Sequence, residues 1–123
     1  MATITELEFG LVANLTSTGT WVQLAKVGGA AYAVPANGET KVRWLRGLNI
    51  HATNAAAVQF AFSTDITIAD DELATPAISL AAGESLEDDR GDVLPPTYAI
   101  WARATGTNPN VTVRAFAFET VTT

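Results

Sequence analysis

Cysteine is absent from this 123-residue chain. The absence excludes a disulfide, a thiolate nucleophile and a cysteine-ligated metal centre. Long apolar runs are also absent, because no stretch approaches the roughly 20 residues that span a bilayer. The first residues show neither the basic start nor the apolar run of a signal peptide. We therefore expect a soluble chain that is made without a signal peptide.

Positive charge is scarce. The chain has 7 lysines and arginines against 13 aspartates and glutamates, which gives a net charge of −6. Nucleic-acid binding depends on phosphate neutralisation by lysine and arginine, and anionic membrane surfaces attract the same residues. The composition therefore predicts no nucleic-acid partner and no membrane partner, and the negative charge favours solubility.

The residues that an exposed helix prefers, such as lysine, arginine and glutamine, are few, whereas threonine occurs 17 times. Threonine, valine, isoleucine and the aromatic residues suit a pleated, half-buried surface. Apolar and polar residues alternate with a period of two along much of the chain, and no helical period persists. We predict an all-β fold, a single antiparallel β-sandwich or jelly-roll-like domain of seven to eight strands over residues 1–123.

Turn signals separate the predicted strands. Residues 1–9 are interpreted as an extended arm or a first strand, and Tyr98 to Val121 is expected to form an antiparallel hairpin around Gly106–Asn110. The stretch Ala81 to Pro96 is expected to be irregular. The remaining strands are expected at Trp21 to Val27, Ala30 to Val34, Thr40 to Thr53, Ala56 to Ser63 and around Ile78 to Leu80.

Three aromatic positions are informative because of their phase. Trp44 is in phase with Val42 and is expected in the core, although Arg46 on the same side indicates a bulge or a strand end. Trp101 is out of phase with Ile100, so we expect an exposed or interfacial side chain. In the last strand Phe116 and the equivalent Phe118 face away from the valines, which predicts a central strand or one that a partner covers.

The residues that could support chemistry form no recognisable motif. His51 is the only histidine, and no serine or aspartate motif accompanies it as a catalytic triad would require. Two acidic groups, at 65–72 and 84–92, invite a calcium interpretation, but neither has the spacing of a calcium-binding loop. We therefore expect no enzyme activity, no catalytic residue, no metal site and no cofactor.

One resemblance covers the C-terminal half, from Leu48 to Glu119. The segments "VQFAFSTD", "LAAGES", "YAIWARATGT" and "VTVRAF" resemble the β-sandwich proteins of tailed-bacteriophage virions, of the head decoration (cement) type or associated with the tail. The resemblance implies synthesis in the host cytoplasm and a place on the capsid surface. It also implies binding to the major capsid protein or another virion protein, which would stabilise the shell.

The same resemblance implies a homo-oligomer, with a trimer favoured. The leading segment could add a strand to the exposed edge of a neighbouring subunit. The alternative function is a carbohydrate- or receptor-binding module on a phage tail, with Trp101 as a candidate contact. The residues expected at a subunit or capsid interface are Ile4, Leu7, Phe9, Trp101, Phe116 and Phe118.

Overall fold

The computed structural model describes residues 3–122, and in this part of the chain it contains ten strands and one short 3-10 helix. Met1, Ala2 and Thr123 lie outside the described residues, so part of the predicted arm does as well. The strands are β1 (Ile4–Leu15), β2 (Val22–Gln23), β3 (Ala25–Lys26), β4 (Gly38–Asn49), β5 (Ala56–Ser63), β6 (Ile78–Leu80), β7 (Ser85–Asp89), β8 (Val93–Leu94), β9 (Ala99–Thr105) and β10 (Val111–Thr122). The 3-10 helix η1 spans Asp70–Glu72.

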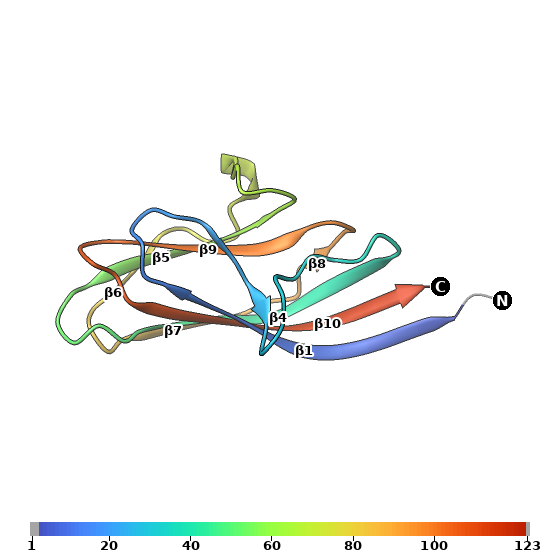
Figure 1. Ribbon diagram of the computed structural model, residues 1–123, viewed down its shortest axis with the longest axis horizontal. Helices are drawn as coiled ribbons and strands as arrows, with labels where there is room; N and C mark the ends of the chain where they lie inside the picture. Colours follow the sequence, from blue (N-terminus) through green and yellow to red (C-terminus); the bar gives the residue numbers. More distant parts are fainter. Residues whose placement is uncertain (1–2, 123) are drawn as a thin grey trace.

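The strands form two antiparallel sheets that lie one above the other (Figure 1). The six-stranded sheet has the order β3-β1-β10-β4-β7, with β8 also beside β4, and the four-stranded sheet has the order β2-β9-β5-β6. The first and last long strands are therefore neighbours, and the chain crosses repeatedly between the layers. This is the arrangement of two Greek keys in a jelly roll. The predicted all-β antiparallel sandwich is confirmed.

The hydrophobic core lies between the sheets, as the period-two alternation predicted. Val58 and Phe60 of β5 point inward, as do Val113 and Ala115 of β10. Alanine also occupies inward positions of β9, opposite larger side chains such as that of Phe60. Strand β10 is central, between β1 and β4, and it carries apolar residues on both faces, as predicted.

The predicted hairpin at the C-terminal end is wrong. β9 pairs with β2 and β5, whereas β10 pairs with β1 and β4, so the loop between them connects the two sheets. Gly106 in this loop has a φ of 149°, and a Cβ atom there would lie 2.9 Å from the carbonyl oxygen of Ala55. A short glycine-containing loop between two alternating strands looks the same in the sequence, whichever sheet the second strand joins.

Three other segments differ from expectation. Residues 81–96, expected to be irregular, contain β7 and β8, which pair with β4. The segment Ala30 to Val34 is no strand and contributes only an isolated bridge between Ala31 and Ala25. The expected strand Trp21 to Val27 is divided into β2 and β3, which belong to different sheets.

Candidate binding surface

A β-bulge in β4 determines which side chains reach the outer face of the six-stranded sheet. Phe116 of β10 pairs with Trp44, but the next residue, Ala117, pairs with Val42, so Arg43 is an extra residue in β4. Because an inserted residue reverses the alternation, Val42 points into the core while Trp44 points outward. The prediction that Trp44 is a core residue is therefore wrong. The predicted bulge exists, although it lies at Arg43 rather than at Arg46.

The outward residues after the bulge form a surface that we call the open face. It comprises Trp44, Arg46 and Leu48 of β4 and Arg114, Phe116 and Phe118 of β10. The Trp44 and Phe116 rings are stacked, with centroids 5.8 Å apart and planes inclined by 16°. The Arg46 guanidinium carbon lies 4.1 Å from the centroid of the Trp44 ring. Leu48 is 42% exposed, and the two phenylalanines are half-buried.

The open face brings two arginines together. Arg46 and Arg114 are direct cross-strand partners, an arrangement that is unfavourable for like charges. Arg46 is partly compensated by Glu87 of β7, with 3.6 Å between Nε and Oε1. Among residues 3–122, Arg114 forms no ion pair, and it is exposed. The face therefore carries an uncompensated positive charge on a protein of net charge −6.

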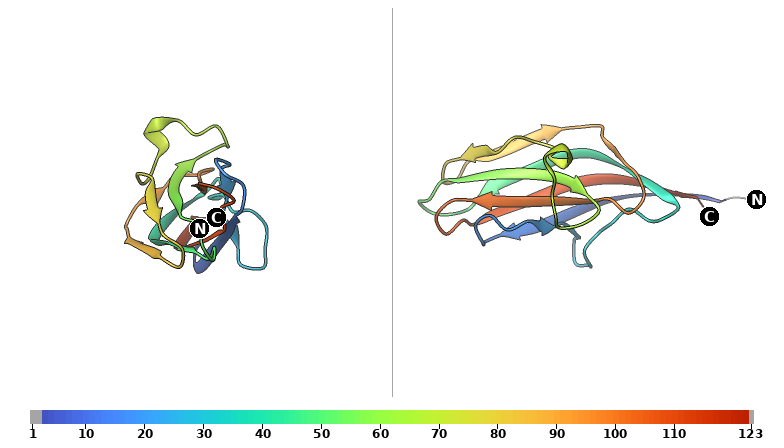
Figure 2. Two further views of the ribbon diagram at one scale, coloured as in Figure 1. Left: turned by 90° about the vertical axis from the view of Figure 1, so that its left-hand side faces the viewer. Right: turned by 90° about the horizontal axis from the view of Figure 1, so that it is seen from above.

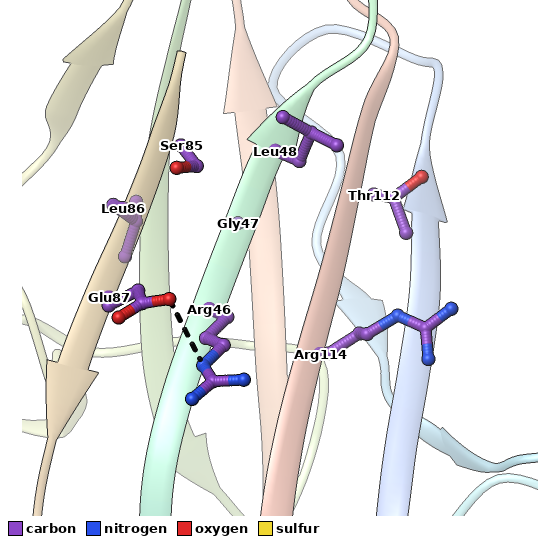
Figure 3. Close-up of a pocket in the computed structure, with 8 residues that line it drawn as sticks. All are labelled: Arg46, Gly47, Leu48, Ser85, Leu86, Glu87, Thr112 and Arg114. Atoms are coloured by element: carbon purple, nitrogen blue, oxygen red, sulfur yellow. Dashed lines mark ion pairs between the residues drawn. The ribbon is translucent and has the colours of Figure 1, made fainter. Parts of the chain in front are cut away.

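A shallow hollow of about 490 Å³ lies at one end of the open face. Figure 3 shows that its side chains come from β7, β4 and β10, and that the guanidinium groups of Arg46 and Arg114 point in different directions. The lining residues are Arg46, Gly47, Leu48, Ser85, Leu86, Glu87, Thr112 and Arg114. Apolar side chains flanked by arginines are typical of protein-binding surfaces.

The outer face of the four-stranded sheet, which we call the covered face, has the opposite character. Residues 64–77, with η1, pass over β5 and β9 (Figure 2, right). Trp101 is only 8% exposed beneath this loop, and its Nε1 donates a hydrogen bond to the Ser63 carbonyl oxygen at 3.1 Å. The prediction that Trp101 is exposed is wrong. Its outward phase was inferred correctly, but Ile68 and Leu73 of the loop pack over it.

The predicted interface residues of β1 lie toward the end of the molecule that carries both termini (Figure 1). Residues from Ile4 onward form a strand that pairs with β10. Ile4 is 64% exposed and Leu7 is 47% exposed. Phe9 is half-buried and packs against the core, with its ring centroid 4.8 Å from that of Tyr32.

His51 has a structural role in a turn. Its Nδ1 accepts hydrogen bonds from the backbone N–H groups of Thr53 and Asn54, at 3.1 and 2.9 Å. Because Nδ1 is the acceptor, the neutral ring carries its proton on Nε2. These bonds hold the turn that leads from β4 to β5.

In the acidic group at 84–92, two aspartates are bound by an arginine of the same segment. Arg90 donates one hydrogen bond to Asp88, at 2.8 Å, and another to Asp92. The hydrogen bond that Arg90 donates to Asp92 is the main cause of a raised Arg90 pKa. Within residues 3–122 no group of three or more histidines, aspartates or glutamates has the geometry to hold a metal ion. The same residues include no helix of the length and apolarity required to cross a membrane.

A buried polar cluster lies at one end of the core. The Tyr32 hydroxyl donates a hydrogen bond to Oε2 of Glu119 at 2.6 Å and lies 2.6 Å from Oγ1 of Thr40. Burial is the main cause of a raised Tyr32 pKa, and the hydrogen bond to Glu119 raises it further. The cluster satisfies the buried carboxylate of Glu119 in β10, so its role is structural.

Comparison with known proteins assigns no family. No family model matches the sequence, and no curated protein matches it. Solved structures with a similar arrangement include a chain of the Bacillus endospore appendages, which form disulfide-linked pili. It is 15% identical, with 97% of this chain and 89% of that chain covered and a TM-score of 0.48.

Viral capsid proteins are also among the similar structures. The capsid of cyanophage Pam1 matches with 12% identity, a TM-score of 0.44, and 98% of this chain and 86% of that chain covered. A protein of infectious bursal disease virus matches with 8% identity and a TM-score of 0.45. That match covers all of this chain but 32% of the viral one, so the chain spans about a third of its length. Similarities of this size do not define a function.

Proposed function

We propose that this chain is a non-enzymatic structural protein of a tailed-phage virion, a capsid decoration or cement protein that binds and stabilises the assembled head. Its partner is the major capsid protein or another virion protein. The proposal combines the sequence resemblance over Leu48 to Glu119 with the open face. It places the attachment surface on the open face.

The observation that carries the proposal is the composition of the open face. The exposed side of an antiparallel sheet is normally polar. Here it presents Trp44, Phe116 and Phe118 with two arginines. Tryptophan and arginine are enriched among the residues that dominate binding energy, and phenylalanine is enriched in interface cores. Trp44, Phe116 and Phe118 are each partly exposed, whereas the opposite sheet is covered by its own loop. A sheet surface with only a shallow hollow fits a large assembled partner better than a small molecule.

The proposal includes self-association, with a trimer favoured. Capsids present their subunits in symmetric groups, and a homo-oligomer would match such a group with several copies of the open face. Several linked contacts raise the apparent affinity without any new contact type. Light scattering at micromolar concentration is expected to report a mass well above 12.9 kDa. A monomer mass would remove this part of the proposal.

Co-sedimentation with capsids of the virus that encodes the chain tests the attachment. The wild-type protein is expected to sediment with capsids, and the double variant Arg46→Ser/Phe118→Ser is expected to remain in the supernatant. The matched control is Asp70→Ser/Asp71→Ser, which changes two exposed residues of the covered face and should bind normally. Equal binding by the two double variants would show that the open face is not the attachment surface.

The carbohydrate-binding alternative has lost its principal residue, because Trp101 is buried under residues 64–77. A glycan array separates the two functions. The cement proposal predicts no glycan binding, and a specific glycan ligand combined with no capsid binding would replace it.

A further inference from the structure

The free edge of β1 is the second surface of the molecule without a partner. Strand β3 pairs with β1 only at Leu11 and Val12, and Val27 adds one hydrogen bond to the carbonyl oxygen of Gly10. Along Ile4–Phe9, β1 pairs with β10 on one side, and within the described chain no strand pairs with its other side. Six residues are a typical strand length, so this edge can accept a complete strand.

The hydrogen-bonding groups of this edge can be assigned from two contacts. The carbonyl oxygen of Gly10 points to the β3 side, where it accepts from Val27 at 3.4 Å. On β10, the backbone N–H of Thr122 donates to the carbonyl oxygen of Asn37 at 3.0 Å, so it points away from β1. Thr122 is the cross-strand partner of Ile4. Because peptide groups alternate along a strand, both contacts indicate that the N–H and C=O groups of Ile4, Glu6 and Glu8 point to the free edge.

The two faces of β1 along this edge differ in the charge of their side chains. Glu6 and Glu8 share the outer face of the sheet, where their β10 partners are Thr120 and Phe118. Neither glutamate forms an ion pair with any described residue. Leu7 lies on the other face and is 47% exposed. A strand that pairs here therefore meets carboxylates on one face and apolar side chains on the other.

A second copy of this chain does not fit the edge. Two β1 strands could pair in antiparallel orientation with their outer faces on the same side of the joint sheet. In that arrangement Glu6 or Glu8 would lie opposite a glutamate or an isoleucine of the other copy. The opposite edge of the same sheet, β7, carries Glu87 and Asp89 on the outer face, so a head-to-tail sheet would also oppose like charges. Like charges in direct cross-strand positions are destabilising. The acidic edge thus disfavours extension of the sheet through copies of itself.

We infer that the Ile4–Phe9 edge of β1 receives an extended segment of a different protein, in which lysine or arginine alternates with apolar residues. The segment adds a strand to the six-stranded sheet, its cations opposite Glu6 and Glu8 and its apolar residues beside Leu7. This inference rests on the proposed function, because it identifies the chemistry of a virion partner. It concerns the β1 edge of the same sheet, which borders the open face because Glu8 pairs with Phe118.

Peptides of roughly eight residues, within the usual length of a strand, test the inference. An alternating lysine–valine peptide is expected to bind the wild-type chain about tenfold or more tightly than an alternating glutamate–valine peptide, and less tightly at high salt. A block peptide of the same lysine and valine content, which cannot alternate, should also bind about tenfold more weakly. Binding should slow hydrogen exchange of the Glu6 and Glu8 amides. Equal binding of the lysine peptides, or protection elsewhere, would overturn the inference.

Variants of Glu6 and Glu8 distinguish the contribution of side-chain charge to peptide binding from that of backbone hydrogen bonds. Glu6→Lys/Glu8→Lys is expected to reverse the preference toward the glutamate–valine peptide, while Asp70→Lys/Asp71→Lys, with the same change in net charge, retains the lysine preference. Glu8→Pro removes one N–H that points to the free edge, which an edge strand tolerates. It should weaken lysine–valine binding about tenfold, and more than Glu8→Gln does. If both acidic pairs respond alike, the binding is nonspecific and the inference fails.

The capsid experiment keeps the two proposals distinct. Loss of capsid binding by open-face variants, with no peptide preference at β1, would retain the proposed function and remove the edge site. A clear peptide preference with no capsid binding would do the reverse.

Discussion

The two outer faces of the sandwich both carry outward aromatic side chains, and they differ in what covers these side chains. On the four-stranded sheet, residues 64–77 fold over Trp101 and hydrogen-bond to β5 at Phe60 and Gln59. The six-stranded sheet has no such loop, and its outer face carries Trp44, Phe116 and Phe118. One face is completed by the chain itself, and we propose that a partner completes the other.

This difference teaches that an outward aromatic residue has no fixed meaning in a sandwich. Trp101 and Trp44 are both large, and both point away from the core. The first contributes to folding because its cover belongs to the same chain. The second contributes to binding, in our proposal, because its cover does not. The variants below separate these contributions.

Removal of Trp101 is expected to give the largest change in stability. Trp101→Ala deletes a buried ring and its hydrogen bond to Ser63, and such deletions lower the free energy of unfolding by about 3–5 kcal/mol. Chemical denaturation followed by circular dichroism measures this change. A loss below about 1 kcal/mol would show that the loop does not hold the ring in solution.

Removal of Phe116 is expected to affect attachment more than folding. Phe116→Thr keeps a strand-forming residue but removes the stack on Trp44, which lowers the free energy of unfolding by about 1 kcal/mol. Capsid binding is expected to weaken by about tenfold or more, equivalent to about 1.4 kcal/mol. Binding isotherms and denaturation curves of the same preparation give both values. A large loss of stability with unchanged binding would assign Phe116 to folding alone.

Tyr32 provides a reference inside the sandwich, away from both outer faces. Tyr32→Phe leaves the buried carboxylate of Glu119 without its tyrosine donor, which lowers the free energy of unfolding by about 1–3 kcal/mol at neutral pH. Capsid binding should not change. Loss of binding would show that variants of the core disturb the open face indirectly.

The same variant has a pH signature. The pKa of Tyr32 is raised in the folded state, mainly by burial, whereas an unfolded tyrosine ionises near about pH 10. Unfolding therefore releases a proton above that pH, and wild-type stability falls by up to about 1.4 kcal/mol per pH unit. Because Tyr32→Phe lacks this group, the stability difference between the two proteins should narrow between about pH 10 and 11. A constant difference would contradict the raised pKa.

Arg114 gives the smallest expected change and the opposite sign. Arg114→Gln removes the repulsion with Arg46, so the free energy of unfolding should rise by about 0.2–1 kcal/mol. The gain should shrink in high salt. At the same time capsid binding should weaken and become less dependent on salt. A loss of stability would show that Arg114 has a favourable partner within the chain.

The sequence predicted the fold class because alternation with a period of two is a local property. It predicted a strand at Ala56 to Ser63, where β5 lies, and it predicted that β10 is a central strand or one that a partner covers. The outward direction of Phe116 and Phe118 followed from the same alternation. Each of these conclusions depends only on neighbouring residues in one strand.

The errors share a different cause, since they concern relations between strands. The Arg43 bulge depends on how β4 pairs with β10, and it reverses the phase of Trp44 and of every outward residue that follows. The cover over Trp101 depends on a loop some 30 residues earlier in the sequence. The pairing partners of β9 and β10 depend on the whole topology. In the sequence, the change of phase was indicated by Arg46, a charged residue on the side of the strand that was expected to be apolar.

The adjacency of β1 and β10 also governs how the chain reaches its structure. Ile4 pairs with Thr122, so the centre of the six-stranded sheet joins positions at opposite ends of the described sequence. During synthesis β1 and β4 leave the ribosome long before β10, the strand that separates them, exists. Folds dominated by such distant pairings form slowly, in milliseconds to seconds, and leave unpaired edges exposed meanwhile. Loss of β10 would remove the shared neighbour of β1 and β4, and truncated chains should therefore aggregate rather than fold partially.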